Sequence, residues 1–313
     1  MPKFSVVIPI YNKARFLKKT LQSVLDQTFR DFEIIAVNDG STDGSLSILK
    51  SFSDDRILII DQKNQGLSQS RNNGIAAATG ELVALLDADD LWKPNHLYTL
   101  NQLNDRFPTA AVLGVGYEES YGNNNVIKPD LNLDNIFEPQ IITDFFLANM
   151  KQPIISQSSM ALKPDVIKNC GGFDPNVTYA EDVDFYIRLF LKNDLAYDPT
   201  ITCRHTMNAP EQITRSKKSE RKVPNFQKYL EANPKDASLK RFINLKRYFL
   251  AIFYKVEGNV NLYRSMRDSV DTSLLTKRQR QLLRAPKLVV IVLRKIKSLF
   301  LKSGKRLTSF NRE

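Results

Sequence analysis

Strand-like apolar segments alternate with helix-like amphipathic segments through the first hundred residues, and this alternation limits the possible folds most. Four segments are almost wholly apolar and have the length of strands: FSVVIPI (4–10), FEIIAVND (32–39), RILIIDQ (56–62) and ELVALLDAD (81–89). Helical spacing of apolar residues follows the first of them, at Phe16, Leu17, Leu21, Val24 and Leu25. Such a pattern predicts an α/β fold with a mainly parallel sheet covered by helices on both faces.

Two more helices fill the later intervals. STDGSLSILKSF (41–52) predicts a helix with Ser41 or Thr42 as N-cap, and LSQSRNNGIAAATG (67–80) predicts one closed by Gly80. From about Tyr117 the pattern loosens, beginning with a polar loop at 122–135. The sequence then predicts two short helices, a strand and a longer helix: ITDFFLANM (142–150), PDVIKNCGG (164–172), ISQSSMALK (155–163) and EDVDFYIRLFLKN (181–193).

Charge divides the chain near residue 215. Residues 216–313 hold 25 Lys and Arg against 7 Asp and Glu, a net +18; the other 20 basic and 27 acidic residues give −7, and the sum is +11. We therefore predict a first domain over 1–215 and a basic α-helical C-terminal region over 216–313. The imbalance indicates that the C-terminal region meets an anionic partner.

Cysteines and histidines are too few for a disulfide scaffold or a zinc site. Cys170 and Cys203, with His96 and His205, do not have the spacing of zinc ligands, so we expect a reducing, cytosolic setting. The N-terminal MPKFSVVIPIYN has no small-residue cleavage site, and we expect a first strand there rather than a signal peptide.

Polar residues gather where the predicted strands end, at 9–12, 38–40, 64–66 and 87–90. In a parallel sheet these ends share one edge, where ligands bind. The turn PIYNKAR after the first strand has no glycine, and no Walker A sequence is present. Phosphate at this edge would therefore need a metal, and Asp87 with Asp89 suits Mg²⁺ or Mn²⁺. The alternative is that both acids are solvated turn residues.

Six motifs stand in order along the first two-thirds of the chain: PIYNK (9–13), VNDGSTDGS (37–45), NQGLSQSRNNGI (64–75), LDADD (86–90), GGFD (171–174) and ED (181–182). In order and spacing they resemble the family 2 inverting nucleotide-sugar glycosyltransferases. The resemblance covers about residues 3–215. It implies a GT-A fold, an α/β/α sandwich that binds a nucleoside diphosphate sugar and a divalent metal, Mn²⁺ or Mg²⁺, at the carboxyl edge of its sheet.

The resemblance also implies roles for single residues. Pro9, Tyr11 and Asn12 would bind the donor nucleotide, with Tyr11 against the base. Asp39 would accept hydrogen bonds from that base, and a carboxylate suits the imide N–H of uracil because it only accepts. Asn38 stands where the family often has a second acid, directly before this aspartate.

The remaining nucleotide and metal roles fall on later motifs. Arg71 would contact the nucleotide as a fixed cation, although a surface helix arginine is the alternative. Asp87 would reach the ribose or the metal, and Asp89 would bind the metal. His205 would either touch the metal or diphosphate or be bonded to nearby backbone. We expect His96 to lie on the surface.

Asp182 corresponds to the general base of the family, the group that takes a proton from the acceptor hydroxyl. Glu181 and Asp184 are alternative bases. All three acids could also simply stabilise a helix start, where the macrodipole favours negative charge. We expect Arg188 to be structural.

The segment 285–307 predicts an amphipathic helix. Its unbroken apolar run, Leu288–Leu293, is only six residues long, whereas crossing a bilayer takes roughly 20. With its Lys and Arg residues, the helix suits an anionic membrane surface. The alternatives are a helix packed on the core and an RNA-binding tail; because no base-reading module is evident, we expect no nucleic-acid partner.

These observations predict a metal-dependent inverting glycosyltransferase with a UDP-linked donor and a glycan or lipid-linked acceptor in surface polysaccharide synthesis. We expect it in the cytoplasm, peripheral on the inner face of the cell membrane. One alternative is a sugar-1-phosphate nucleotidyltransferase. Such an enzyme should carry a glycine- and basic-rich loop after the first strand, and PIYNKAR is not a loop of this kind. Another is an inactive membrane scaffold of the same fold, against which the acids at positions 39, 87, 89 and 182 argue.

Overall fold

The computed structural model describes residues 1–122, 125–133, 136–207, 221–304 and 306. It comprises two compact units. The first contains Met1–Glu119, Asp134–Phe145 and Ile155–Asn225; the second contains Ser120–Leu133, Phe146–Ile154 and Phe226–Glu313. The predicted boundary at residue 215 lies in 208–220, outside the described residues. Two segments from the middle of the sequence thus join the C-terminal helices in the second unit.

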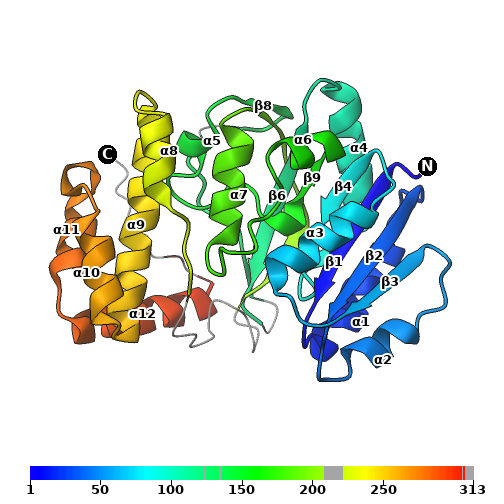
Figure 1. Cartoon of the computed structure of the whole chain (residues 1–313), viewed down its shortest axis with the longest axis horizontal. Helices are drawn as coiled ribbons and strands as arrows, with labels where there is room; N and C mark the ends of the chain where they lie inside the picture. The colour runs from blue at the N-terminus through cyan, green and yellow to red at the C-terminus, as the bar shows by residue number, and fades with distance from the viewer. Residues whose placement is uncertain (123–124, 134–135, 208–220, 305, 307–313) are drawn as a thin grey trace. The chain divides into compact units, whose positions relative to one another are not determined.

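One sheet organises the first unit (Figure 1). Its parallel half has the order β3-β2-β1-β4, formed by Ile57–Gln62, Phe32–Asp39, Phe4–Ile10 and Leu82–Leu85. The sheet continues as β9-β6-β10-β5, formed by Met160–Leu162, Val112–Ser120, Leu195–Thr206 and Leu91–Trp92, and β8 (Gln140–Ile142) pairs with β10. β9 joins the two halves, because it is antiparallel to both β4 and β6. The predicted parallel strands are therefore confirmed, beside a second half that is antiparallel where it meets them.

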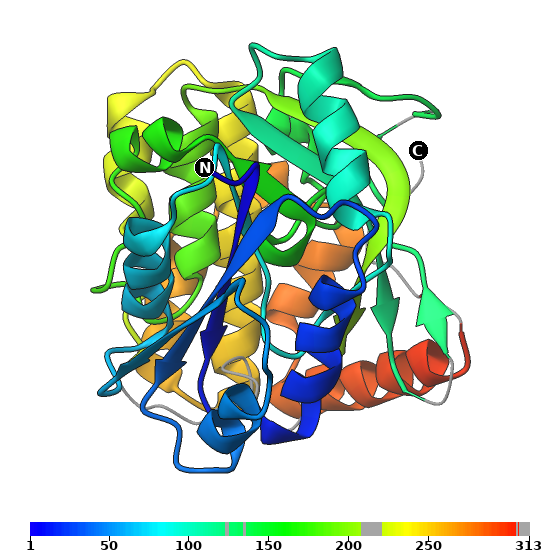
Figure 2. The same ribbon diagram turned by 90° about the vertical axis from the view of Figure 1, so that its right-hand side faces the viewer.

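Helices cover both faces of the parallel half. Helices α1 (Ala14–Leu25) and α3 (Leu67–Ala77) lie on opposite faces of β1 and β2 (Figure 2). Val6 and Ile8 of β1 share a buried core cluster with Leu21 of α1. On the other face Val7 lies so close to Gly74 of α3 that a side chain there would collide with it. The alternation of strand side chains thus supplies both buried faces.

Two predicted helix ends are wrong. Helix α2 is Ser45–Lys50 and begins after Gly44, because Ser41 and Thr42 are bonded to Asn12 instead. Helix α3 ends at Ala77 rather than near Gly80. A side chain at Gly80 would lie 2.7 Å from the backbone nitrogen of Ser5, so this glycine allows the chain to pass close to β1.

The prediction that His96 lies on the surface is also wrong. His96 begins helix α4 (His96–Arg106) and is fully buried. Its ring stacks on Trp92 at 4.1 Å between centroids, and its Nδ1 lies 2.9 Å from Thr202 Oγ1 on β10. Burial lowers the pKa of His96 to about 3. The side chain is a neutral part of the core.

Helices α5 (Phe145–Ala148), α6 (Pro164–Asn169) and α7 (Glu181–Phe190) appear where they were predicted. The predicted strand 155–163 is shorter, because a 3₁₀ turn at Gln157–Ser159 precedes β9. This turn lies beside the end of β4, where Ser158 Oγ accepts a hydrogen bond from the Asp87 N–H at 3.0 Å.

The described part of the second unit is mainly helical and includes β7 (Val126–Ile127). Its helices are α8 (Phe226–Ala232), α9 (Ala237–Glu257), α10 (Val260–Asp268), α11 (Lys277–Arg284) and α12 (Lys287–Lys302), with a 3₁₀ turn at Thr272–Leu274. Buried Lys255 of α9 donates to the carbonyls of Leu283 and Ala285 at 2.6 and 2.8 Å, tying α9 to the end of α11. Among the described residues, no helix is long and apolar enough to cross a membrane.

Candidate active site

The turns after β1 and β2 are bonded together at the carboxyl edge of the sheet. The Asn12 N–H donates to Ser41 Oγ at 3.1 Å, and the Thr42 N–H donates to Asn12 Oδ1 at 2.8 Å. Asn12 itself has a left-handed backbone, φ +53°, which asparagine tolerates. Pro9 is buried in β1, whereas Tyr11 is 47% exposed, so its ring is accessible at this edge.

Asp39 is buried at the end of β2 and is already hydrogen-bonded. Its carboxylate accepts from Gln62 Nε2 at 2.7 Å and from the N–H groups of Gln65 and Gly66 at 2.8 and 2.9 Å. These bonds join the strand to the loop before α3. A nucleobase N–H at Asp39 would add to these donors or replace one of them.

A second acid does lie beside this aspartate, although on the next strand. Asn38 Nδ2 donates to Asp61 Oδ1 at 2.6 Å. Asn38 Oδ1 is buried and has no hydrogen-bond partner among the described residues. The sequence pattern missed Asp61, because pairing between β2 and β3 brings the two residues together.

Arg71 is buried and fixed at the centre of the edge. Its Nη2 lies 2.8 Å from Asp87 Oδ1, its Nη1 lies 3.2 Å from Glu181 Oε1, and its Cζ is 5.0 Å from the ring centroid of Phe173. Burial by itself would lower the pKa of Arg71, but Asp87 and Glu181 raise it above its ordinary value. Arg71 is therefore a permanent cation and not a surface helix arginine.

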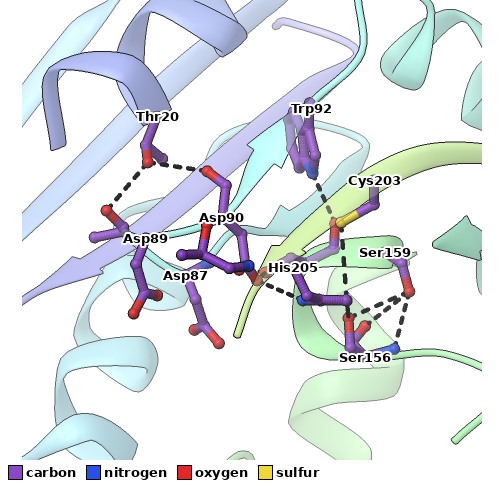
Figure 3. Close-up of polar contacts among 12 residues, drawn as sticks. Thr20, Asp87, Asp89, Asp90, Trp92, Ser156, Ser159, Cys203 and His205 are labelled. Atoms are coloured by element: carbon purple, nitrogen blue, oxygen red, sulfur yellow. Dashed lines mark hydrogen bonds and ion pairs between the residues drawn. The ribbon is translucent and has the colours of Figure 1, made fainter. Parts of the chain in front are cut away.

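The three acids after β4 do not point the same way. Figure 3 shows the carboxylates of Asp87 and Asp89 on one side of the turn, while Asp90 faces His205. Asp89 Oδ2 lies 2.7 Å from Lys13 Nζ, an ion pair that the sequence did not predict. Burial raises the pKa of Asp89, and Lys13 opposes that shift.

His205 is hydrogen-bonded through both ring nitrogens. Nδ1 lies 2.7 Å from Asp90 Oδ2, and Nε2 lies 2.7 Å from Ser156 Oγ. Although burial opposes it, the carboxylate of Asp90 raises the pKa of His205 well above its ordinary value. A metal bond from His205 would require one of these contacts to break. Neither partner is a backbone group, so the alternative expectation, a histidine bonded to nearby backbone, differs from the structure.

No three His, Cys, Asp or Glu side chains in the described part of the chain are grouped to hold a metal ion. Asp87 and Asp89 supply two carboxylates, and the Asp87 side chain is 36% exposed. Hard divalent cations are often held by one or two carboxylates plus substrate phosphate oxygens and water. The residues fit such an ion only if the substrate completes its coordination.

The three candidate bases lie in the first turn of α7 and have different contacts. Ala180 has a left-handed backbone, φ 59° and ψ 37°, and α7 begins directly after it. Asp184 is buried and lies 2.7 Å from Arg188, which also donates to the Cys170 carbonyl. Arg188 is therefore structural, as expected.

Glu181 is likewise engaged, with Arg71, and burial raises its pKa. Asp182 forms no ion pair within the described residues, and its Oδ1 accepts from the Val183 N–H at 2.8 Å. Asp182 still interacts electrostatically with Arg71. It is the acid of this turn whose carboxylate is least committed.

The carboxyl edge of this α/β domain thus brings a fixed arginine, Arg71, together with Asp87 and Glu181. The sequence model of "Glycosyl transferase family 2" matches residues 5–172, and the chain belongs to that family. The family predicted from the six motifs is confirmed.

The matched relatives share part of the chain. An uncharacterized glycosyltransferase of Nostoc sp. is 47% identical over 116 residues, which is 36% of this chain and 35% of the relative. Glycosyltransferase GlyA of Streptococcus pneumoniae is 45% identical over 124 residues, 38% of this chain and 18% of the relative. An uncharacterized glycosyltransferase of Rickettsia prowazekii is 26% identical over 67% of this chain and 65% of the relative. The chain thus spans well under half the length of the first two.

Solved structures confirm the GT-A-type fold. Staphylococcus aureus TarS residues 1–349, solved with UDP-GlcNAc, has a TM-score of 0.67 at 19% identity over 97% of this chain and 92% of that one. The mannosyltransferase PcManGT from Pyrobaculum calidifontis, solved with GDP-Man and Mn²⁺, has a TM-score of 0.52 at 18% identity over 96% of this chain and 87% of that one.

Proposed function

We propose that this chain is an inverting glycosyltransferase that moves a sugar from a UDP-linked donor to a hydroxyl of a glycan or lipid-linked acceptor. The observation that carries the proposal is the arrangement around Arg71. This buried arginine pairs with Asp87 and interacts electrostatically with uncommitted Asp182. This arrangement supports a donor phosphate site and a base at one edge of the sheet.

The chemistry follows from these positions. Asp182 takes the proton of the acceptor hydroxyl as its oxygen attacks the anomeric carbon, and the bond from that carbon to the diphosphate oxygen breaks. Attack from the opposite side inverts the anomeric centre. Arg71 holds a fixed positive charge near the leaving diphosphate. A divalent cation, bound through Asp87 and Asp89 when the donor is present, would stabilise the charge that builds on the leaving group.

Two observations support a UDP donor and Mn²⁺ or Mg²⁺. The Asp39 carboxylate can only accept hydrogen bonds, which suits the uracil imide. Among structures with this fold, TarS was solved with UDP-GlcNAc, and the mannosyltransferase was solved with GDP-Man and Mn²⁺. We place the acceptor in cell-surface polysaccharide synthesis.

Thermal unfolding with UDP-, GDP-, dTDP- and CMP-sugars tests this proposal. A UDP-sugar at about 100 times its Kd should raise the free energy of unfolding by roughly 2.7 kcal/mol with Mn²⁺, and much less in EDTA. Equal stabilisation in EDTA would contradict the assignment of a metal to Asp87 and Asp89.

Release of pyrophosphate from UTP and a sugar 1-phosphate would indicate the nucleotidyltransferase alternative. Donor binding without UDP release would indicate an inactive scaffold.

We also propose that α12 places the chain on an anionic membrane, on the cytoplasmic side. The helix carries five basic residues and no acidic one. Val290 is buried, but seven other apolar residues are exposed: Leu288 75%, Val289 45%, Val292 54%, Leu293 45%, Ile296 40%, Leu299 65% and Phe300 39%. Exposed apolar side chains beside positive charge fit a surface of anionic lipid.

Cosedimentation with phosphatidylglycerol vesicles tests the membrane proposal. Replacing Leu288, Val292 and Leu299 by Gln should abolish binding, whereas Phe249→Gln, at a residue 41% exposed on α9, should not. Equal binding of both variants would assign the vesicle contact to other basic helices. Unfolding of the triple variant would instead show that α12 belongs to the core.

A further inference from the structure

Lys13 and Arg71 both neutralise acids of the candidate metal site, but they are held very differently. Arg71 is buried against two carboxylates and the Phe173 ring. Among the described residues Lys13 makes one ion pair, with Asp89, and its side chain is 15% exposed. A lysine also ends in a compact charge on a flexible stem, whereas a guanidinium is a rigid fork. Of the two cationic side chains, that of Lys13 can change its partner more easily.

The backbone of Lys13 is fixed even though its side chain is not. The Lys13 N–H donates to Ser45 Oγ at 2.8 Å, and the next N–H, of Ala14, donates to Asp43 Oδ2 at 3.0 Å. The charge can therefore change partner only by rotation of the side chain. Any new partner must lie within the same stem length, at the carboxyl edge of the sheet.

Asp89 cannot hold Lys13 and a divalent cation together at low cost. A divalent ion on the Asp89 carboxylate would lie within a few ångströms of the ammonium group, because Nζ is 2.7 Å from Oδ2. Both are positive, and both would bind the same carboxylate, whose Oδ2 already contacts Lys13. Since Asp89 is largely buried, water screens this repulsion poorly.

We propose that Lys13 is an internal counter-ion that occupies Asp89 in the donor-free protein and transfers to the donor diphosphate when the divalent cation binds. The inference rests on the proposed function. It makes Lys13 a positioning residue that couples the two ligands. The anionic diphosphate draws Lys13 away and frees Asp89 for the metal, and the metal in turn drives Lys13 toward the diphosphate. Metal and nucleotide should therefore bind with positive cooperativity, and the coupling must be reciprocal.

Electron paramagnetic resonance of free Mn²⁺ tests this, with and without saturating UDP. In the unaltered chain UDP should tighten Mn²⁺ binding by at least tenfold. Lys13→Met should bind Mn²⁺ at least tenfold more tightly without UDP, bind UDP more weakly, and lose most of the coupling. Lys13→Arg keeps a charge and should leave Mn²⁺ binding without UDP weak. Lys18→Met, an exposed lysine on α1, is the matched control and should behave like the unaltered chain.

The outcomes distinguish the role of Lys13 from the metal dependence of the proposed function. If the unaltered chain binds no Mn²⁺ even with UDP, the metal in the proposed function fails. If UDP promotes Mn²⁺ binding in the unaltered chain but Lys13→Met binds Mn²⁺ no more tightly and keeps the coupling, only the role of Lys13 is overturned. Far-ultraviolet circular dichroism confirms that each variant is folded.

Discussion

Asp182 and Asp184 lie two residues apart on α7, yet their surroundings differ sharply. The Asp184 side chain is 1% exposed and paired with Arg188, whereas Asp182 has no ion pair among the described residues. We predict that Asp182→Asn keeps donor binding and lowers turnover by about 10²-fold or more, because general-base catalysis contributes on that order. Isothermal titration with UDP and a UDP-release assay measure the two effects.

A variant of Asp184 serves as the control for the assignment of Asp182 as the general base. Asp184→Asn should lower the free energy of unfolding by about 3 kcal/mol, because it leaves Arg188 without its buried partner. Normal turnover in the Asp182 variant would move the base to Glu181 or Asp184, the other acids in this turn.

His96 gives a residue-scale prediction about pH. Its pKa falls from 6.5 to about 3 through burial, so the unfolded chain binds a proton that the folded chain excludes. The stability that neutral His96 provides is complete above pH 6.5 and is lost as the pH falls toward 3. Between pH 6.5 and 5 this loss is about 2 kcal/mol, since each pH unit contributes roughly 1.4 kcal/mol.

Urea unfolding at pH 7.5 and pH 5 checks this prediction. His96→Gln cannot titrate, so its loss of stability over this interval should be about 2 kcal/mol smaller than that of the unaltered chain. An identical pH dependence in the two proteins would mean that other groups dominate acid unfolding.

At the scale of elements, α3 depends on Gly74. A Cβ at this position would lie 3.1 Å from Val37 Cγ2 and closer still to Val7. Overpacking typically costs about 1–3 kcal/mol and alanine returns about 1 kcal/mol of helix propensity. We predict that Gly74→Ala lowers the free energy of unfolding by up to about 2 kcal/mol in thermal or urea melts.

Gly44→Ala is the control for that substitution. Its Cβ would meet only Ala14, at an ordinary 3.8 Å, so its stability should be unchanged or slightly higher. A stable Gly74→Ala variant would show that α3 can move away from the sheet without loss.

Sequence periodicity predicted the parallel half of the sheet because both faces of β1, β2 and β4 are buried by nearby helices. It missed β5, β6 and β10, whose partners are distant in the sequence. Cys203 and Trp92, for instance, are opposed in β10 and β5. The polar sequence of 122–135 and the glycines of β6 further weakened the strand pattern there.

The sequence motifs predicted which residues lie at the site. They did not predict which side chains those residues contact, because these contacts depend on tertiary packing. The positions of Asp39 and Asp87 at the carboxyl edge follow from the strand ends, and that of Arg71 follows from the resemblance to the family. Their partners do not: Lys13 meets Asp89, and His205 meets Asp90, across turns that only the folded sheet brings together. Periodicity likewise gave no sign that His96 is buried, because its partner Thr202 lies on β10.

For the whole molecule, charge separation predicts how membrane binding depends on salt. Residues 216–313 carry +18 and residues 1–215 carry −7. Each basic residue near an anionic surface contributes roughly 1 kcal/mol, and screening weakens this within a Debye length of ~10 Å at 0.1 M salt. We predict that 0.5 M NaCl releases most of the protein from phosphatidylglycerol vesicles.

Neutral phosphatidylcholine vesicles are the control, since they lack the charge that attracts the chain. Binding to them should be weak at every salt concentration. Retention on anionic vesicles in 0.5 M NaCl would mean that the apolar face of α12 holds the protein without electrostatic help.

The junction at β9 has a consequence for how the chain folds during synthesis. Strands β1 to β4 are complete within the first 85 residues, so their pairings can form early. The other half must wait for β10, whose Cys203 pairs with Trp92 more than a hundred residues earlier. Contacts of such long sequence separation slow folding. The carboxyl edge of β1, β2 and β4 can therefore form before His205, which contacts Asp90, has been made.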